Sequence, residues 1–310
     1  MKLVLHIGRP KTGTTSLQQF LYKNRKRLSE FGYFLFDEVG VPNNIDIPAY
    51  FSREAIGGLT SWARRWGITT SEEKEAHFTA RNFVQNFDHQ VSSASETHHT
   101  AIMTSEQFST ALPASGDIER LAQFLSERFD SVNVVCFVRS QVDLLPSSWS
   151  TEIRSGGTTT LRRAVKRTVS QQPFNYLKQA EAWSSCFGRK NVHFSRYRSD
   201  QVWDIRRRFA QMYLPDVEGL VYLSQRANSS YSANEASLVR LINVVFPFWL
   251  PGARRPNLKN RKARTLVSKF FVKKSRPIKL NSRQAGLVAN AYQASNAEFS
   301  REHLSPGETL

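Results

Sequence analysis

Short apolar runs and longer amphipathic stretches alternate along the chain, and this pattern predicts strands separated by helices. The apolar runs that predict buried strands are residues 3–7, 32–36, 100–105 and 132–138. After the first run, apolar residues recur at helical spacing from Thr14 onward, at Leu17, Phe20, Leu21 and Leu28. The segment DIERLAQFLSERF, before the fourth run, has the same spacing. Strands alternating with helices predict an α/β fold of three layers, with a central, mostly parallel sheet flanked by helices.

The second half of the chain is marked by a helix start and a basic segment. Ser232 and Glu235 form a capping-box pattern ahead of an apolar repeat at Leu238, Leu241, Ile242 and Val245. From Arg254 to Arg283, lysines and arginines recur with no acidic residue between them. This basic segment, at about residues 252–283, is either a solvated face or a contact surface for an anionic polysaccharide or a membrane. We expect residues 1–310 to form a single domain.

Residues 41–67 look like an excursion from the core that helps to form an acceptor cleft. Proline and glycine punctuate it, and four residues combine aromatic and cationic side chains, namely Trp62, Arg64, Arg65 and Trp66. Such a group suits a sugar- or anion-binding surface, but packing of an amphipathic loop explains it as well.

The composition of the chain indicates which class of partner the protein binds and in which compartment it is found. The formal net charge of +17 favours an anionic partner, without choosing among nucleotide, nucleic acid, polysaccharide and lipid. Two cysteines, Cys136 and Cys186, do not make a disulfide framework. The first strand begins too early for a secretory signal, and the apolar segment LINVVFPFWLP is short and broken. These features lead us to expect a soluble, cytoplasmic protein.

The first predicted strand leads into a loop with the composition of a phosphate site. Gly8 and Gly13 have the glycine spacing of a Walker A loop, but Lys11 lies between them and Thr14 stands where that motif places lysine. Backbone amides, the start of the next helix and neighbouring hydroxyls predict an anion cradle; the hydroxyls belong to Thr12, Thr14, Thr15 and Ser16. An ordinary strand-to-helix turn is the alternative.

Neighbouring strands end without the aspartate that a kinase or NTPase uses for Mg²⁺. The run AIMTSE ends in Ser105 and Glu106, and VNVVCFV is followed by Arg139. A cation at the end of a strand indicates a second anion rather than a metal. His6, beside the loop, is expected to be a satisfied core histidine.

The segments PKTGTTS and FVRSQVDLLPSSWSTEIRSG resemble the two-part cofactor signature of sulfotransferases that use 3′-phosphoadenosine 5′-phosphosulfate (PAPS). They are most similar to the soluble bacterial branch, in which HIG-x-x-KTGTTSLQ recurs. The matching residues of the second segment are Arg139, Gln141, Asp143, Ser147 and Trp149. The resemblance is strong over residues 3–28 and 132–156, moderate over AIMTSEQF, WSSCFGRKNVHFSRY and RANSSYS, and weak elsewhere. The RKG motif of the cytosolic animal enzymes is absent, so the adenine contacts stay unassigned.

This resemblance implies a P-loop-like fold and transfer of a sulfuryl group from PAPS to an acceptor hydroxyl, leaving adenosine 3′,5′-bisphosphate and needing no metal. The resemblance also implies a carbohydrate or glycoconjugate as the acceptor. By the same resemblance, cofactor binding falls to Lys11, Thr12, Gly13, Thr14, Thr15, Ser16, Arg139 and Ser147. Lys11 would stabilise the leaving phosphate, and Arg139 and Ser147 would hold the 3′-phosphate. Glu106 is the candidate general base, although a solvated carboxylate or helix-start residue fits its position nearly as well.

Two other functions are alternatives. A P-loop kinase or nucleotidase would use Mg-ATP. A basic nucleic-acid-binding protein would account for the charge, but it leaves the pairing of Lys11 with Arg139 and Ser147 unexplained, so no nucleic-acid partner is expected.

Overall fold

The computed structural model describes residues 1–37, 39–40, 42–53, 59–112, 115–198, 204–222, 231–250, 255–271 and 277–310. Contacts divide the chain into two compact units. The first comprises Met1–Val138, Leu177–Ala227 and Phe299–Thr309, and the second comprises Arg139–Tyr176 and Asn228–Glu298 together with Leu310. The single-domain interpretation stays a prediction.

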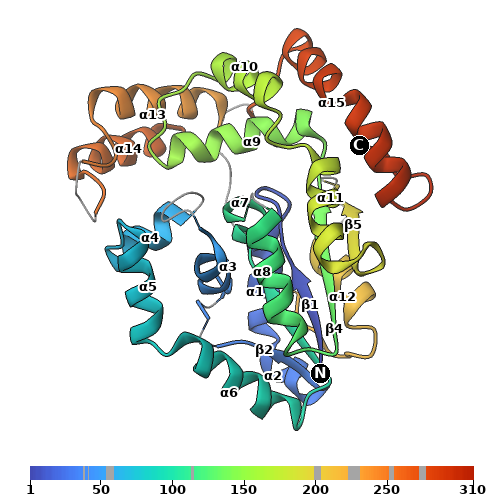
Figure 1. Ribbon diagram of the computed structural model, residues 1–310. Coiled ribbons are helices and arrows are strands. Elements are labelled where there is room, and N and C mark those ends of the chain that lie inside the picture. The colour runs from blue at the N-terminus through green and yellow to red at the C-terminus, as the bar shows by residue number, and fades with distance from the viewer. Residues whose placement is uncertain are drawn as a thin grey trace. The chain divides into compact units, whose positions relative to one another are not determined.

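A five-stranded parallel sheet forms the centre of the first unit (Figure 1). Its strands are β1 (Lys2–His6), β2 (Tyr33–Leu35), β3 (Thr100–Thr104), β4 (Ser131–Val138) and β5 (Val192–Arg196), in the order β2-β3-β1-β4-β5. Strand β1 pairs with β3 on one side and β4 on the other, so that Val4 lies opposite Ile102 and Asn133. The α/β fold and the four predicted strands are confirmed, whereas β5 was missed.

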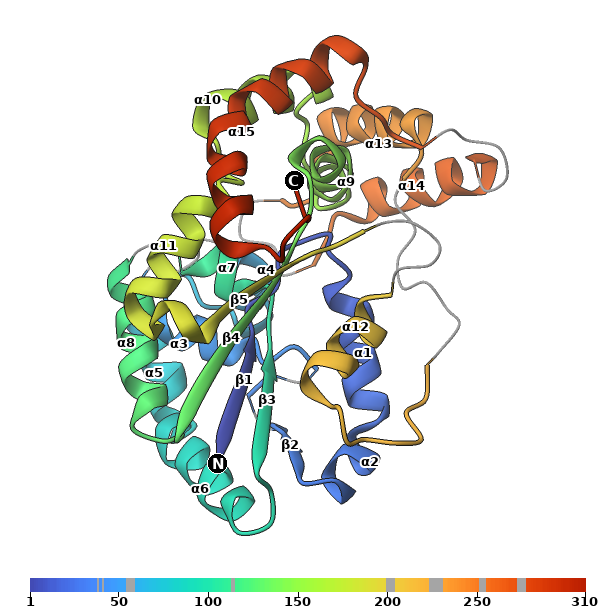
Figure 2. The ribbon, with the colours of Figure 1, turned by 90° about the vertical axis from the view of Figure 1, so that its right-hand side faces the viewer.

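Helices cover both faces of this sheet, as Figure 2 shows. On one face lie α1 (Thr14–Lys23) and α12 (Ile205–Tyr213), and α1 continues into α2 (Arg25–Glu30). Leu17, Phe20 and Leu21 of α1 share a core cluster with Ile205 and Phe209 of α12. On the other face lie α8 (Ser115–Ser126) and α11 (Tyr176–Phe187). The apolar spacing seen in the sequence therefore marks the buried face of α1.

Short helices fill the connections after β2 and β3. They are α3 (Asp46–Phe51), α4 (Thr60–Trp66), α5 (Ser71–Ala80), α6 (Phe83–Ser95) and α7 (Gln107–Ala111), and a 3₁₀ turn, η2 (Arg189–Asn191), precedes β5. The predicted excursion at residues 41–67 thus contains α3 and α4. Val41 and residues 54–58, with Gly57 and Gly58, lie outside the described residues.

The second unit is helical. It contains α9 (Gln141–Arg154), α10 (Leu161–Gln171), α13 (Ala233–Val245), α14 (Leu258–Phe271) and most of α15 (Ser282–His303). Trp149 and Ile153 of α9 pack with Val239 of α13 and Tyr292 of α15. The predicted capping box is confirmed, because the Ser232 side chain accepts from the Glu235 amide and the Glu235 carboxylate accepts from the Ser232 amide.

Both cysteines are free thiols, and Cys136 is fully buried in β4. Among the described helices, none combines the length and the apolar composition that crossing a bilayer requires.

Candidate phosphate and transfer site

The loop between β1 and α1 is held by three hydrogen bonds to a single carbonyl oxygen, and we call these three bonds the clasp. The Arg9 carbonyl accepts hydrogen bonds from the Thr12 amide at 3.3 Å, the Thr12 hydroxyl at 2.7 Å and the Thr14 hydroxyl at 3.1 Å. Both threonine side chains are buried. The clasp encloses Lys11, whose φ of 71° lies in the left-handed region that non-glycine residues seldom adopt. The surrounding bonds therefore hold Lys11 in a strained backbone conformation, a feature that clusters at ligand sites.

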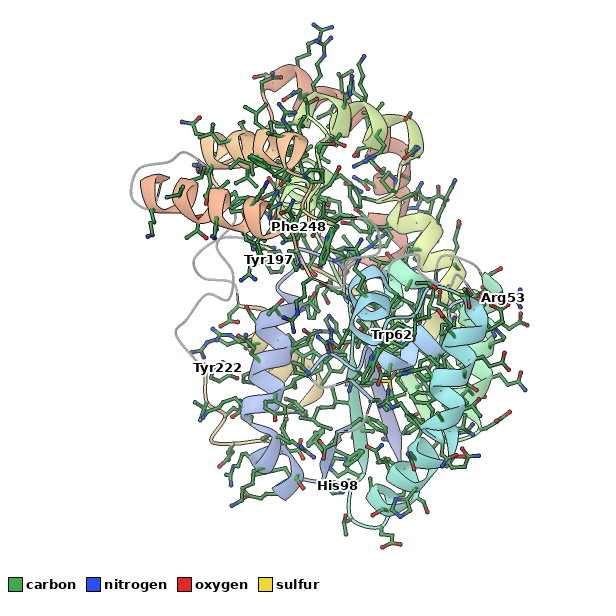
Figure 3. The ribbon with its side chains drawn as sticks, turned by 90° about the vertical axis from the view of Figure 1, so that its left-hand side faces the viewer. Arg53, Trp62, His98, Tyr197, Tyr222 and Phe248 are labelled. Atoms are coloured by element: carbon green, nitrogen blue, oxygen red, sulfur yellow. The ribbon has the colours of Figure 1, made fainter. Side chains whose placement is uncertain are left out.

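Close packing explains the two glycines of this loop. Gly8 has a φ of 35°, and a Cβ there would lie 3.1 Å from Thr14 Cγ2 and 3.3 Å from the Glu106 Cα. Gly13 has a φ of 81°, and a Cβ there would lie 3.2 Å from the ring of Tyr197 (Figure 3). Larger residues would push the loop away from its neighbours.

The amino end of α1 has the properties of an anion site. Gly13 is the N-cap and has no side chain to accept from the first helical amides, and the first turn contains no acidic residue. The amides of Thr14, Thr15 and Ser16 have no acceptor within the helix, and the dipole there favours negative charge. The Thr15 side chain is exposed and that of Ser16 is half-buried. Both hydroxyls are thus open to a ligand.

Glu106 is brought to the same loop by β3. It is the N-cap residue of α7, directly beyond the end of β3, and β3 pairs with β1. Burial raises the pKa of the Glu106 carboxyl, and the charge of Lys11 partly opposes this rise. Ser109 of α7 ties the two segments together, because its hydroxyl lies within hydrogen-bonding distance of the Gly8 and Glu106 carbonyl oxygens. The structure therefore brings Glu106, the candidate base, next to the loop that contains Lys11.

His6 lies beneath the loop as a buried, neutral side chain. Its Nδ1 lies 2.8 Å from the Thr104 hydroxyl, and its Nε2 has no hydrogen-bond partner within the described residues. Burial lowers the pKa of His6 to about 3. The expected core histidine is buried, but only one ring nitrogen is satisfied.

Arg139 and Ser147 belong to the second unit. Arg139 follows the last residue of β4, and Ser147 lies on α9. The Tyr176 hydroxyl donates to the Arg139 carbonyl oxygen at 2.7 Å. Nearby, the side chains of Gln141 and Asn296 exchange hydrogen bonds at 2.9 Å, which anchors the start of α9. Both expected 3′-phosphate residues are partly buried.

A cavity of about 440 Å³ lies in the first unit, beyond the end of β2. Its polar and aromatic lining includes Asp37, Arg65, Trp66, Arg81, Asn86 and Gln90. Trp66 is 47% exposed, whereas Trp62 is buried and donates its indole N–H to Asp46 at 2.7 Å (Figure 3). The aromatic and cationic group seen in the sequence thus divides into a packed Trp62 and a Trp66 that lines the cavity.

Sequence reasoning missed three residues that support the site. In the first unit, the Ser109 hydroxyl lies by the Gly8 carbonyl and the Asn44 side chain accepts from the Thr104 amide at 2.9 Å. In the second unit, the Tyr176 hydroxyl donates to the Arg139 carbonyl. Each is far in sequence from its partner and lies in no recognisable motif. Only the tertiary fold brings each of them to its partner.

The chain is similar to the crystal structure of a sulfotransferase from Alicyclobacillus acidocaldarius, with 11% sequence identity and a TM-score of 0.46, over 96% of this chain and 94% of that chain. No protein-family model matches the sequence, and no curated protein does.

Proposed function

We propose that this protein transfers a sulfuryl group from PAPS to a hydroxyl group of a carbohydrate acceptor and releases adenosine 3′,5′-bisphosphate, without a metal ion. The observation that carries the proposal is the loop at residues 8–16, in which hydrogen bonds to the Arg9 carbonyl hold Lys11 at positive φ beside an uncapped helix start. In the reaction the bond from sulfur to the bridging phosphate oxygen breaks. A bond from sulfur to the acceptor oxygen forms, and the acceptor proton passes to Glu106.

The loop suits the 5′-phosphate end of the donor. The Thr12 amide and the Thr12 and Thr14 hydroxyls already donate to the Arg9 carbonyl. Of these two residues, Thr14 would therefore hold the phosphate, through its backbone amide. Thr15 and Ser16 would add their hydroxyls to the amides of the helix start. This arrangement supports the predicted anion cradle, but the Thr12 and Thr14 hydroxyls would take no part in it.

Lys11 would act on the leaving group. Negative charge grows on the bridging oxygen as the sulfuryl group departs, and an ammonium held there stabilises the transition state more than the bound donor. The clasp on Arg9 supports this role, because it fixes the backbone on both sides of Lys11.

Glu106 would act as the general base. A carboxylate whose pKa is raised is a stronger base than an ordinary surface carboxylate. Its position after β3 places it next to the loop that would hold the transferred group.

Arg139 and Ser147 would hold the 3′-phosphate. A guanidinium matches a phosphate with paired N–H donors, and a hydroxyl can add a further hydrogen bond. The sequence resemblance supports this assignment, and so does the anchoring of the Arg139 backbone by Tyr176.

The cavity lined by Trp66 supports a carbohydrate as acceptor. A sugar presents an apolar face that packs on an indole and hydroxyls that bond to amides and carboxylates. Trp66, Asn86, Gln90 and Asp37 supply those groups, and Arg65 would favour an acidic sugar.

A Mg-ATP-dependent kinase is the second candidate, because Glu106 lies two residues beyond the end of β3, a strand next to β1, and such enzymes place a metal-binding carboxylate near the end of a neighbouring strand. Radiolabelled PAPS, offered with a panel of neutral and acidic oligosaccharides in the presence of a chelator, separates the two. Transfer should persist in the chelator and fall at least a hundredfold in Lys11→Ala, while Lys23→Ala, an exposed lysine of α1, should behave as wild type. Transfer that needs Mg²⁺, or that survives in Lys11→Ala, would contradict the proposal.

A further inference from the structure

Helices α13 and α14 of the second unit carry six of the large apolar side chains that are exposed in the described part of the chain. On α13, Leu238 is 38% exposed, Leu241 50%, Val244 55% and Val245 67%; on α14, Leu258 is 66% and Leu266 58% exposed. We call these six residues and the exposed lysines of α14 the α13–α14 surface. Scattered apolar residues are normal on protein surfaces, but a contiguous group usually marks an interaction site.

The apolar side chains of α13 lie on the side opposite its packed face. Ala236, Val239 and Asn243 are buried in the core of the second unit. Leu238, Leu241 and Val245 follow one another at helical spacing on the other side. The apolar repeat that the sequence shows on this helix is therefore not its core face, which is formed by other residues.

Helix α14 is oriented by two buried polar side chains. Asn260 donates to Asn243 Oδ1 at 3.1 Å, and Arg264 donates to the Arg154 carbonyl at 2.7 Å. Leu258, Lys262, Leu266 and Lys269 lie away from these residues, at spacings of four, four and three. Figure 2 shows α13 and α14 side by side, and α13 also packs against α9.

The same surface is strongly cationic. Lys259, Arg261, Lys262 and Lys269 are exposed on α14, and no residue of this helix is acidic. The one acidic residue of α13, Glu235, is half-buried and bonds to Ser232 and Ser268. Residues 272–276, which include Lys273 and Lys274 of the predicted basic segment, lie outside the described residues, as does Arg254.

We propose that the α13–α14 surface binds peripherally to membranes that contain anionic lipids. Exposed leucine and valine side chains would enter the interface between headgroups and acyl chains, and the lysines would pair with the headgroups. This inference is independent of the proposed transfer reaction.

The positive charge and the apolar side chains of this surface together favour an anionic membrane over a second copy of the chain or an acidic polysaccharide. A symmetric dimer through this surface would place the lysines of one copy against those of the other, since an isologous interface pairs each patch with itself. An acidic polysaccharide would match the lysines but would leave the six apolar side chains in water. An anionic bilayer satisfies both.

The full-length protein should be sedimented with vesicles of pure phosphatidylcholine and with vesicles that contain 30% phosphatidylglycerol. Binding should be at least tenfold stronger to the anionic vesicles and should weaken as salt is raised. Leu241→Ser/Val245→Ser should reduce binding at least tenfold, and so should Lys259→Gln/Lys262→Gln. Matched control pairs that remove the same groups elsewhere, Val221→Ser/Leu287→Ser and Lys23→Gln/Lys190→Gln, should bind as wild type.

Each other outcome overturns the proposal. Equal binding to both kinds of vesicle, no binding, or full binding by the Leu241→Ser/Val245→Ser variant would exclude the apolar and cationic contact described here. Light scattering and heparin chromatography test the other occupants. A dimer that the Leu241→Ser/Val245→Ser variant dissociates, or heparin binding lost only in the lysine variant while vesicles are not bound, would assign the surface to a second copy or to a polysaccharide.

Discussion

The Tyr176 hydroxyl donates a 2.7 Å hydrogen bond to the carbonyl oxygen of Arg139, and the Arg139 amide approaches the same hydroxyl at 3.4 Å. Tyr176 is fully buried, whereas Arg139 is only partly so. A rigid aromatic side chain therefore fixes the backbone of Arg139. If Arg139 holds a phosphate, Tyr176 is its positioning residue.

Tyr176→Phe should weaken the binding of adenosine 3′,5′-bisphosphate by about three- to tenfold, because losing one hydrogen bond costs about 1 kcal/mol and frees the Arg139 backbone. Isothermal titration calorimetry measures the change. Tyr292→Phe is the matched control, since this buried tyrosine donates to the Thr168 carbonyl at 3.3 Å. Both variants should lose similar stability, and equal loss of nucleotide binding in the two would refute a positioning role for Tyr176.

Thr12→Val should lower the free energy of unfolding by about 1–2 kcal/mol, because it removes a buried donor from the Arg9 carbonyl. It should also reduce transfer, since Lys11 loses part of the clasp that holds its backbone. Urea denaturation provides the first value and the PAPS assay the second. Thr15→Val, at an exposed position, should leave stability unchanged while weakening donor binding. A loss of stability in Thr15→Val, or unchanged stability in Thr12→Val, would contradict the assigned roles.

Glu106→Gln should reduce turnover by about 10²- to 10⁴-fold with donor binding retained, as expected for the loss of a general base. It should also raise the melting temperature at neutral pH. A carboxyl whose pKa is raised in the folded state stabilises the fold at low pH and loses that contribution as the pH rises through the folded pKa. Near-normal turnover in this variant would remove Glu106 from the mechanism.

His6→Gln should flatten the acid dependence of stability. The folded state keeps His6 neutral down to about pH 3, whereas the unfolded chain protonates it near pH 6.5. Wild-type stability should therefore fall as the pH drops below 6.5, with this residue contributing up to about 1.4 kcal/mol per pH unit. Urea denaturation between pH 6.5 and 4 gives the slope. An unchanged slope in His6→Gln would be inconsistent with a buried neutral His6.

The sequence predicted those parts of the fold that short-range pattern controls. The strands β1 to β4 are apolar runs, and α1 is recognisable from Leu17, Phe20 and Leu21, because strand and helix periods differ. Strand β5 escaped notice since VHFSR is short and mixes polar with apolar residues. The face of α13 was equally hard to assign, because Leu241 and Val245 are apolar but exposed.

The candidate site was predictable in its residue types but not in its contacts. Lys11 and Glu106 are far apart in sequence, and only the pairing of β1 with β3 brings them together. The Thr12 hydroxyl looked like a phosphate ligand, yet it bonds to the Arg9 carbonyl two residues before Lys11. Composition identifies which groups a loop contains, whereas the backbone conformation decides where each hydroxyl donates.

Calorimetric titration of the wild-type protein and Arg139→Ala with adenosine 3′,5′-bisphosphate, and separately with ATP and Mg²⁺, tests the central claim most directly. The account predicts tight binding of the bisphosphate that needs no metal and weakens in Arg139→Ala, with weaker binding of Mg-ATP. Preference for Mg-ATP, or no binding of either nucleotide, would contradict the assignment of residues 8–16 and Arg139 to a PAPS site.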